Sequence, residues 1–156
     1  MEMDRRQLLK GAGGGAVLAL AAAAGLLKPG TARAEAWNKA AFETKSLNDA
    51  VKAMGGTAAV ESKDIAIESP DIAENGAVVP FTLSSKLPRT QQMALLVEKN
   101  PNILAASFTI PDGTEAWVNT RVKMGQTSNI IALVKADGKF YYTTKEVKVT
   151  LGGCGG

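Results

Sequence analysis

The amino-acid sequence predicts a mainly β protein, an antiparallel β-sandwich that is preceded by short helices. Three observations support this prediction. The hydrophobic period changes from three or four residues to two after Gly56. About seven segments with the two-residue alternation follow at close spacing, separated by Gly, Pro, Asn or Asp. No helical pattern interrupts them, which favours a sandwich over a parallel sheet.

Residues 1–34 are predicted to be an export signal rather than part of the fold. Arg5 and Arg6 stand side by side ahead of an uncharged run at 11–27 that is rich in Gly and Ala, and an A-x-A cleavage pattern ends at Ala34. This order resembles a twin-arginine (Tat) signal, which would direct the protein to the periplasm. The alternative is a membrane anchor, but a spanning helix needs about 20 strongly apolar residues, and this stretch is shorter and weakly hydrophobic.

The positive charge of the whole chain belongs to this leader. Residues 1–34 contain five of the 18 basic and two of the 15 acidic side chains, so the other 122 of the 156 residues carry 13 of each. A neutral domain without a basic stripe is not expected to bind nucleic acid. A chain of this length buries roughly two thirds of its unfolded surface, which is enough for one hydrophobic core.

Two short helices are expected between Trp37 and Met54. Apolar residues recur there at spacings of three and four, and Ser46 with Asp49 has the form of a capping box. The glycine pair that follows Met54 is expected to end the second helix. Trp37 and Phe42 are predicted to anchor this segment on the core, in preference to forming a ligand clamp.

The expected strands follow in segments 64–69, 77–85, 104–110, 115–124, 128–136 and 139–151. Segment 93–99 fits both a strand and a helix, and the prolines on both sides of it favour a strand. The pair Asp137-Gly138 predicts a two-residue hairpin turn, because both residues tolerate a positive φ. Trp117 is predicted to lie in the core.

The residue inventory excludes most catalytic and metal chemistry. With no histidine and one cysteine, the chain lacks the parts of a Ser-His-Asp or Cys-His site and of a zinc or iron–sulfur site. No phosphate-binding glycine loop follows a predicted strand, and no cofactor or metal is expected. The remaining polar candidates are predicted to be solvent-exposed: Asp71 with Glu74, Asp112 with Glu115, and Arg121 with Lys123 and Gln126.

One reactive group remains, the thiol of Cys154, the only cysteine of the chain. The alternation of Val147, Val149 and Leu151 predicts that the last strand is held against the sheet up to Leu151, so the sandwich domain is expected to span residues 35–151. In an oxidising compartment a single cysteine forms no internal disulfide. It must therefore be free, paired with another molecule, or chemically loaded.

Residues 152–156 are predicted to form a flexible carrier arm. Glycine has no side chain and wide backbone freedom, so the arm would be thin on both sides of the thiol, and at ~3.3–3.6 Å per residue the thiol would stand about 10 Å off the domain. The neighbouring residues of Cys154 offer no cation or helix N-terminus that favours the thiolate. We therefore expect a carrier that its partners activate. The arm glycines are Gly152, Gly153, Gly155 and Gly156.

These features together resemble the SoxY family, the sulfur-carrier subunits of the Sox thiosulfate-oxidising system. The resemblance includes the twin-arginine leader, the sandwich and the terminal GGCGG. It extends to SPDIAENGAVVPF at 69–81 and TRVKMGQTSNIIALV at 120–134. It implies an immunoglobulin-like fold, a heterodimer with a SoxZ subunit, and a protein without catalytic residues of its own.

The same resemblance implies that Cys154 holds the intermediates of thiosulfate oxidation as covalent adducts. A c-type cytochrome, SoxAX, would attach thiosulfate oxidatively. The hydrolase SoxB would release sulfate, and the molybdenum-containing dehydrogenase SoxCD would oxidise the remaining sulfane sulfur.

An alternative that needs no chemistry is a periplasmic interaction module in which Cys154 forms only an intermolecular disulfide. The flanking glycines favour the carrier, because a disulfide does not require a thin chain on both sides. Prenylation is excluded, because it requires a cysteine four residues from the end.

The leader leads to a testable expectation about export. Tat cargo crosses the membrane folded, and no cofactor site is expected that would require folding in the cytoplasm, so we expect export together with a bound partner that lacks a leader. Changing Arg5 and Arg6 to Lys should then retain both proteins in the cytoplasm, as measured by cell fractionation and immunoblotting. A partner that still reaches the periplasm would contradict this expectation.

Overall fold

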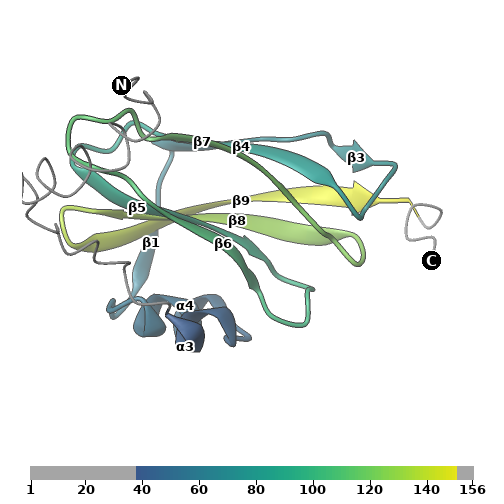
Figure 1. The fold of residues 1–156 in the computed structure, drawn as a ribbon, viewed down its shortest axis with the longest axis horizontal. Coiled ribbons are helices and arrows are strands. Elements are labelled where there is room, and N and C mark those ends of the chain that lie inside the picture. The colour runs from purple at the N-terminus through teal and green to yellow at the C-terminus, as the bar shows by residue number, and fades with distance from the viewer. Residues whose placement is uncertain (1–37, 151–156) are drawn as a thin grey trace, which may run out of the picture. The chain divides into compact units, whose positions relative to one another are not determined.

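Two facing β-sheets make up most of the computed structural model, which describes residues 38–150 (Figure 1). The larger sheet contains β1 (Ala59–Glu61), β3 (Ile72–Ala73), β5 (Thr90–Val97), β6 (Leu104–Thr109), β8 (Ser128–Ala136) and β9 (Lys139–Val149). The smaller sheet contains β2 (Ile65–Glu68), β4 (Val79–Ser85) and β7 (Trp117–Val122). The two helices are α3 (Lys39–Phe42) and α4 (Leu47–Ala53).

The strand order explains how the sandwich is built. The larger sheet has the order β1-β9-β8-β5-β6, with β3 added beside β9, and the smaller sheet has the order β2-β4-β7. Neighbouring strands of both sheets are antiparallel, except that β1 and β3 run parallel to β9. The predicted mainly β, immunoglobulin-like sandwich is therefore confirmed. No helix within residues 38–150 is long and apolar enough to span a membrane.

The main hydrophobic core lies between the two sheets. Because side chains alternate between the faces of a strand, every second residue of the central strands enters this core. The fully buried members include Val79, Phe81, Leu83, Met93, Leu95, Val97, Ile130 and Val134. Burial of each such side chain contributes about 1.5–3 kcal/mol, so this layer dominates the stability of the domain.

Helices α3 and α4 cover the outer face of the larger sheet, as Figure 1 shows. Val51 of α4 packs in a second cluster with Leu96, Leu133 and Phe140 of the sheet. Phe42 is partly buried against the same cluster, as predicted, and Trp37 lies outside the described residues. The helical segment therefore makes a third layer of the fold.

The ends of α4 follow the predicted signals. The Ser46 hydroxyl accepts a hydrogen bond from the Asp49 backbone N–H at 3.1 Å and donates one to the Asp49 carboxylate at 2.6 Å. At the other end, Gly55 has φ +85°, and the Gly56 N–H donates to the Val51 carbonyl at 2.8 Å. The Gly55 N–H also donates to the Lys52 carbonyl at 3.0 Å, and these two bonds form the Schellman arrangement that glycine permits.

The six segments predicted as strands all contain strands, and the ambiguous segment 93–99 lies largely in β5, so its interpretation as a strand is confirmed. Strands β1 and β3 were not predicted. They have three and two residues, which is too short for an alternation to be recognised. Because both run parallel to β9, the expectation of a wholly antiparallel sandwich is wrong at this edge.

The prediction that Trp117 lies in the core is also wrong. Trp117 is 52% exposed. It pairs with Ser84, whereas its neighbour Val118 pairs with the buried Leu83 and packs against the core. The alternation of β7 therefore places Val118 inward and Trp117 on the outer face of the smaller sheet.

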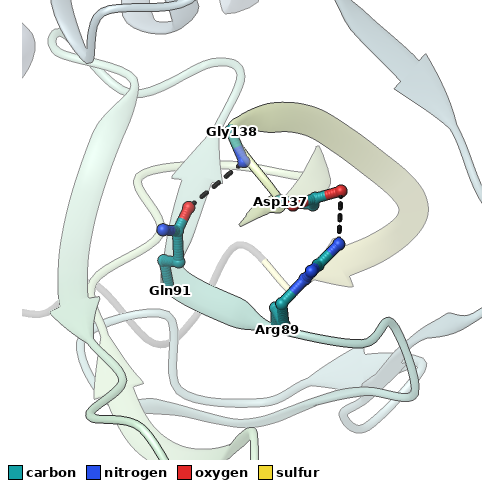
Figure 2. A network of polar contacts seen from close by, with 4 residues as sticks. All are labelled: Arg89, Gln91, Asp137 and Gly138. Carbon is teal, nitrogen blue, oxygen red and sulfur yellow. Dashed lines mark hydrogen bonds and ion pairs between the residues drawn. The ribbon is translucent and has the colours of Figure 1, made fainter.

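The predicted hairpin turn joins β8 to β9. Asp137 has φ +51° and Gly138 has φ +74°, and Figure 2 shows how the start of β5 holds this turn. The Arg89 guanidinium pairs with the Asp137 carboxylate at 2.7 Å, and the Gly138 N–H donates to the Gln91 side chain at 3.2 Å. Both ion-pair partners are mostly exposed, so this pair contributes only about 0–1 kcal/mol.

Gly56 provides a test of the packing between α4 and the sheet. A Cβ at this position would lie 2.4 Å from a Phe140 ring carbon and 2.8 Å from a Val51 methyl carbon. We expect Gly56→Ala to destabilise the protein by about 1–3 kcal/mol, because both neighbours are fixed in the cluster. Chemical denaturation measures this loss.

Gly125→Ala is the matched control. The nearest atom to a Cβ there is the Asn100 side-chain oxygen at 4.0 Å, so the change in unfolding free energy should stay within ~0.5 kcal/mol. Equal losses for the two variants would contradict the packing argument.

Candidate functional site at the end of β9

The predicted attachment residue and its arm follow directly after the part of the chain that the structure describes. Cys154 and the glycines at 152, 153, 155 and 156 lie outside residues 38–150, and so do Arg5 and Arg6 of the predicted signal. The part of the site that the structure describes is therefore the end of β9, from which the predicted arm begins.

Strand β9 is the longest of the described strands, with 11 residues. One edge pairs with β8 from Lys139 to Val147. The other edge pairs with β1 at its beginning and with β3 at its end, where Ile72 faces Lys148 and Ala73 faces Val149. The strand is thus held from both edges close to its last residue.

Four hydrogen bonds fix the final residues of this strand. The Lys148 N–H donates to the Asp71 carbonyl at 3.0 Å, and the Val149 N–H donates to the Thr127 hydroxyl at 2.9 Å. Thr150 donates twice, from its N–H to the Ala73 carbonyl at 3.1 Å and from its hydroxyl to the Glu74 carbonyl at 3.3 Å. The base of the predicted arm is therefore a fixed point at Thr150.

The side chains of this segment follow the predicted alternation. Val147 is fully buried, and Val149 packs partly buried against the core between the sheets. Lys148 and Thr150 are exposed. Leu151, the last residue that the sequence predicts to pack, lies outside the described residues.

Two connections surround the base of the predicted arm: residues 72–78, which include β3 and lead from it to β4, and residues 123–127 between β7 and β8. Together they are called the rim. The Met124 N–H donates to the Gly76 carbonyl at 2.7 Å, which ties the two connections together. Asn100 binds the second connection through the Lys123 carbonyl at 2.8 Å and the Gly125 N–H at 3.3 Å. Met124 itself is fully buried, so the rim is attached to the core.

The polar candidates are exposed, as the sequence predicts. Asp71 forms an ion pair with Lys145 at 3.0 Å, and its side chain remains 87% exposed. The other members of the two carboxylate pairs and of the basic segment are also exposed: Glu74, Asp112, Glu115, Arg121, Lys123 and Gln126. Within residues 38–150, no group of three or more His, Cys, Asp or Glu side chains is arranged to hold a metal ion.

Two surface hollows lie at the other end of the sandwich. One has a volume of about 290 Å³ and is lined by residues 56–60 and 138–141. The other, of about 310 Å³, is lined by residues 85–87, 89–90, 111–114 and 116. Both adjoin the end where β9 begins, so neither is next to Thr150.

Sequence reasoning missed the residues that fix the base of the arm. Thr127 contributes one hydrogen bond from a connection between strands, and β3 has only two residues, which is too short for a periodic pattern. The only sequence signal is the cluster of Pro, Asp, Asn and Gly at 70–76, which predicts a turn but not which strand it contacts.

Comparison with known proteins provides the context for this site. The profile of the family described as "Sulfur oxidation protein SoxY" matches residues 50–154. The solved structure of the sulfur carrier protein SoxY from Chlorobium limicola f thiosulfatophilum is 37% identical, covers 67% of this chain and 96% of its own, and has a TM-score of 0.62. Among curated proteins there is no significant match.

A more distant solved structure shares only the fold. The superoxide reductase (neelaredoxin) from Ignicoccus hospitalis is 17% identical, covers 55% of this chain and 80% of its own, and has a TM-score of 0.50. At this identity the likeness shows a common sandwich and nothing about chemistry.

The bond from Val149 to Thr127 can be tested by amide exchange. We expect Thr127→Ala to accelerate exchange of the Val149 amide proton by about fivefold, because one hydrogen bond contributes about 1 kcal/mol. Hydrogen exchange followed by NMR measures this rate. Thr144→Ala, at an exposed position in the same strand, is the control and should leave that rate unchanged. An unchanged rate in Thr127→Ala would mean that the bond does not fix the strand end.

Proposed function

The chain belongs to the SoxY family, the sulfur carriers of Sox thiosulfate oxidation, and we propose that it holds the intermediates of that oxidation covalently on Cys154 and presents them to partner enzymes. The observation that supports this most strongly is the extent of the family match. It runs to residue 154, which is the only cysteine of the chain. The 37% identical structure, which covers 96% of its own chain, is itself a sulfur carrier protein.

The proposed chemistry begins with attachment of thiosulfate. The Cys154 thiol loses its proton, two electrons pass to an oxidising partner, and a sulfur–sulfur bond forms to the terminal sulfur of thiosulfate. We assign the oxidant role to a c-type cytochrome of the SoxAX type. The product is an S-thiosulfonate on Cys154.

Hydrolysis follows on a second partner. Water attacks the sulfonate sulfur of the adduct, sulfate leaves with one proton released, and a persulfide remains on Cys154. We assign this step to a hydrolase of the SoxB type. A dehydrogenase of the SoxCD type would then oxidise the outer sulfane sulfur to a sulfonate, with three oxygen atoms from water and six electrons passed to that enzyme. Hydrolysis of this sulfonate releases a second sulfate and returns the free thiol.

The fixed base at Thr150 fits this role. Hydrogen bonds hold Thr150 to Ala73 and Glu74, and four residues then lead to Cys154. At ~3.3–3.6 Å per residue, those four residues span at most about 14 Å when extended. The carried group can therefore enter a channel in a partner while the sandwich stays outside.

The setting of this function is also proposed. The Arg5-Arg6 leader supports export to the periplasm through the Tat system, with cleavage after Ala34. We propose that a SoxZ-type subunit binds the sandwich as a heterodimer, as the family implies. The chain would act as a covalent substrate carrier, and the catalytic groups would belong to its partners.

Mass spectrometry tests the covalent role. Intact protein from thiosulfate-grown cells should carry sulfur-oxyanion adducts, and fragmentation should place them on the peptide that contains Cys154. A population that is only disulfide-linked would instead support the interaction module in which the cysteine performs no chemistry.

The variant Cys154→Ser separates fold from function. Because the sequence predicts no packed residue after Leu151, the unfolding free energy of this variant should stay within ~0.5 kcal/mol of the parent. Thiosulfate-dependent turnover in a reconstituted system should be lost. Retained turnover would show that the thiol is not the attachment point.

A further inference from the structure

We propose that the rim is the docking surface for the partner proteins that take up the arm, and that the side chains of Ile72 and Val78 are its apolar contacts. The expected occupant is a protein whose reactive centre lies at the bottom of a narrow channel with an apolar mouth. This inference rests on the proposed function of Cys154 and adds where the partners touch the sandwich.

The short distance from Thr150 to Cys154 requires such a surface. Thr150 is bound to Ala73 and Glu74, and Cys154 is the fourth residue after it, which limits the reach of the thiol to about 14 Å. A protein that encloses the thiol in a channel must therefore bring its own surface close to Thr150. The residues that surround Thr150 are those of the rim.

The exposed hydrophobic side chains divide between the two ends of the sandwich. Among the described residues, four large hydrophobic side chains are exposed: Val60 at 63%, Ile72 at 57%, Val78 at 53% and Trp117 at 52%. Val60 pairs with Tyr141 near the beginning of β9, and Trp117 pairs with Ser84 at the end of β4. Ile72 and Val78 lie at the opposite end, where β9 ends and β4 begins (Figure 1).

The fold does not explain why these two positions are apolar. Ala73 and Val79 belong to the core between the sheets, and Ile72 and Val78 each precede one of them. Successive side chains of a strand point to opposite faces, so Ile72 of β3 points away from the core, and Val78, in the turn before β4, is 53% exposed. A polar residue would serve the fold equally well at both positions, whereas an apolar contact for another protein requires a hydrophobic one.

The rim is rigid enough to act as a docking surface. The turn between β3 and β4 is closed by the Ala77 N–H, which donates to the Asn75 side chain at 2.9 Å, and by the bond from Met124 to Gly76. A surface that is already ordered loses little conformational entropy on association. Two apolar side chains on such a surface can therefore contribute measurably to binding.

The charges around the rim favour contact by apolar groups over electrostatic attraction. Lys148 and Lys123 lie on or beside it, and so do Glu74 and Asp71, the second of which pairs with Lys145. Because the rim has both positively and negatively charged side chains around it, it does not strongly attract a partner surface of either charge. Several partners with different surface charges can then use the same rim.

A kinetic experiment tests the rim with the sulfate-releasing hydrolase as the partner. The substrates are the parent protein and its variants, each loaded with the thiosulfate adduct on Cys154, which mass spectrometry verifies. The test variant is Ile72→Thr with Val78→Thr, which keeps the β-branched shape of both side chains. We expect KM for the carrier to rise by about tenfold, because two exposed apolar groups are lost from the contact, and kcat to stay near the parent value.

The matched control is Val60→Thr. Val60 is also a β-branched, exposed residue in a short strand that runs parallel to β9, but it lies at the other end of that strand. Its KM should equal that of the parent. Thermal unfolding of all variants should coincide with the parent, which shows that any change in KM is not a loss of fold.

Each outcome separates the docking proposal from the proposed function. If the loaded parent protein releases no sulfate, the proposed function fails and the docking proposal fails with it. If the parent is a substrate but the double variant keeps KM within twofold, or Val60→Thr raises KM equally, only the docking proposal is overturned.

Size-exclusion chromatography with the second subunit adds a further check, because loss of that complex in the double variant would assign the rim to the heterodimer instead.

Discussion

The hydrogen-bonded edge of β9 is the constraint on which the rest of this protein depends. Along one edge β9 pairs with β8, and at its end the other edge pairs with β3, so the last strand of the sheet cannot fray without breaking bonds on both sides. Thr127 and Thr150 complete this attachment through their hydroxyl groups. The carrier arm that we propose requires a fixed origin, and these contacts provide one at Thr150.

The division of the chain into a rigid sandwich and a short reactive segment matches a carrier. A sandwich core of alternating apolar residues gives stability without any ionisable group in the interior, and the described carboxylates and lysines lie on the surface or in exposed pairs. The chain contains no histidine and a single thiol, which fits the proposal that partner proteins supply the acid–base and redox steps. The chemistry can change from partner to partner while the carrier stays the same.

The exposed hydrophobic residues can be interpreted once it is known which side chains of each strand face the core. Trp117 and Ile72 are both apolar and both adjoin core residues in sequence, yet each faces away from the core because its neighbour faces inward. At such positions, folding of the domain does not require an apolar side chain. Ile72 lies beside Thr150 at the end of β9, and Trp117 lies at the opposite end of the sandwich.

The sequence alone determined the sandwich, the capped helices, the hairpin at Asp137-Gly138 and the candidate thiol, because each of these depends on local information. Alternation of apolar and polar residues identifies a strand, and a turn pair such as Asp-Gly identifies a hairpin. A serine three residues before a backbone N–H of the first helical turn identifies a helix cap. A single cysteine between glycines can be read directly from the sequence. Only the tertiary structure placed β3 beside β9, turned Trp117 outward and brought Thr127 to the Val149 amide. These features depend on register and on contacts between residues 22 to 76 positions apart in the chain, and a period-two pattern cannot specify which distant strand supplies a partner.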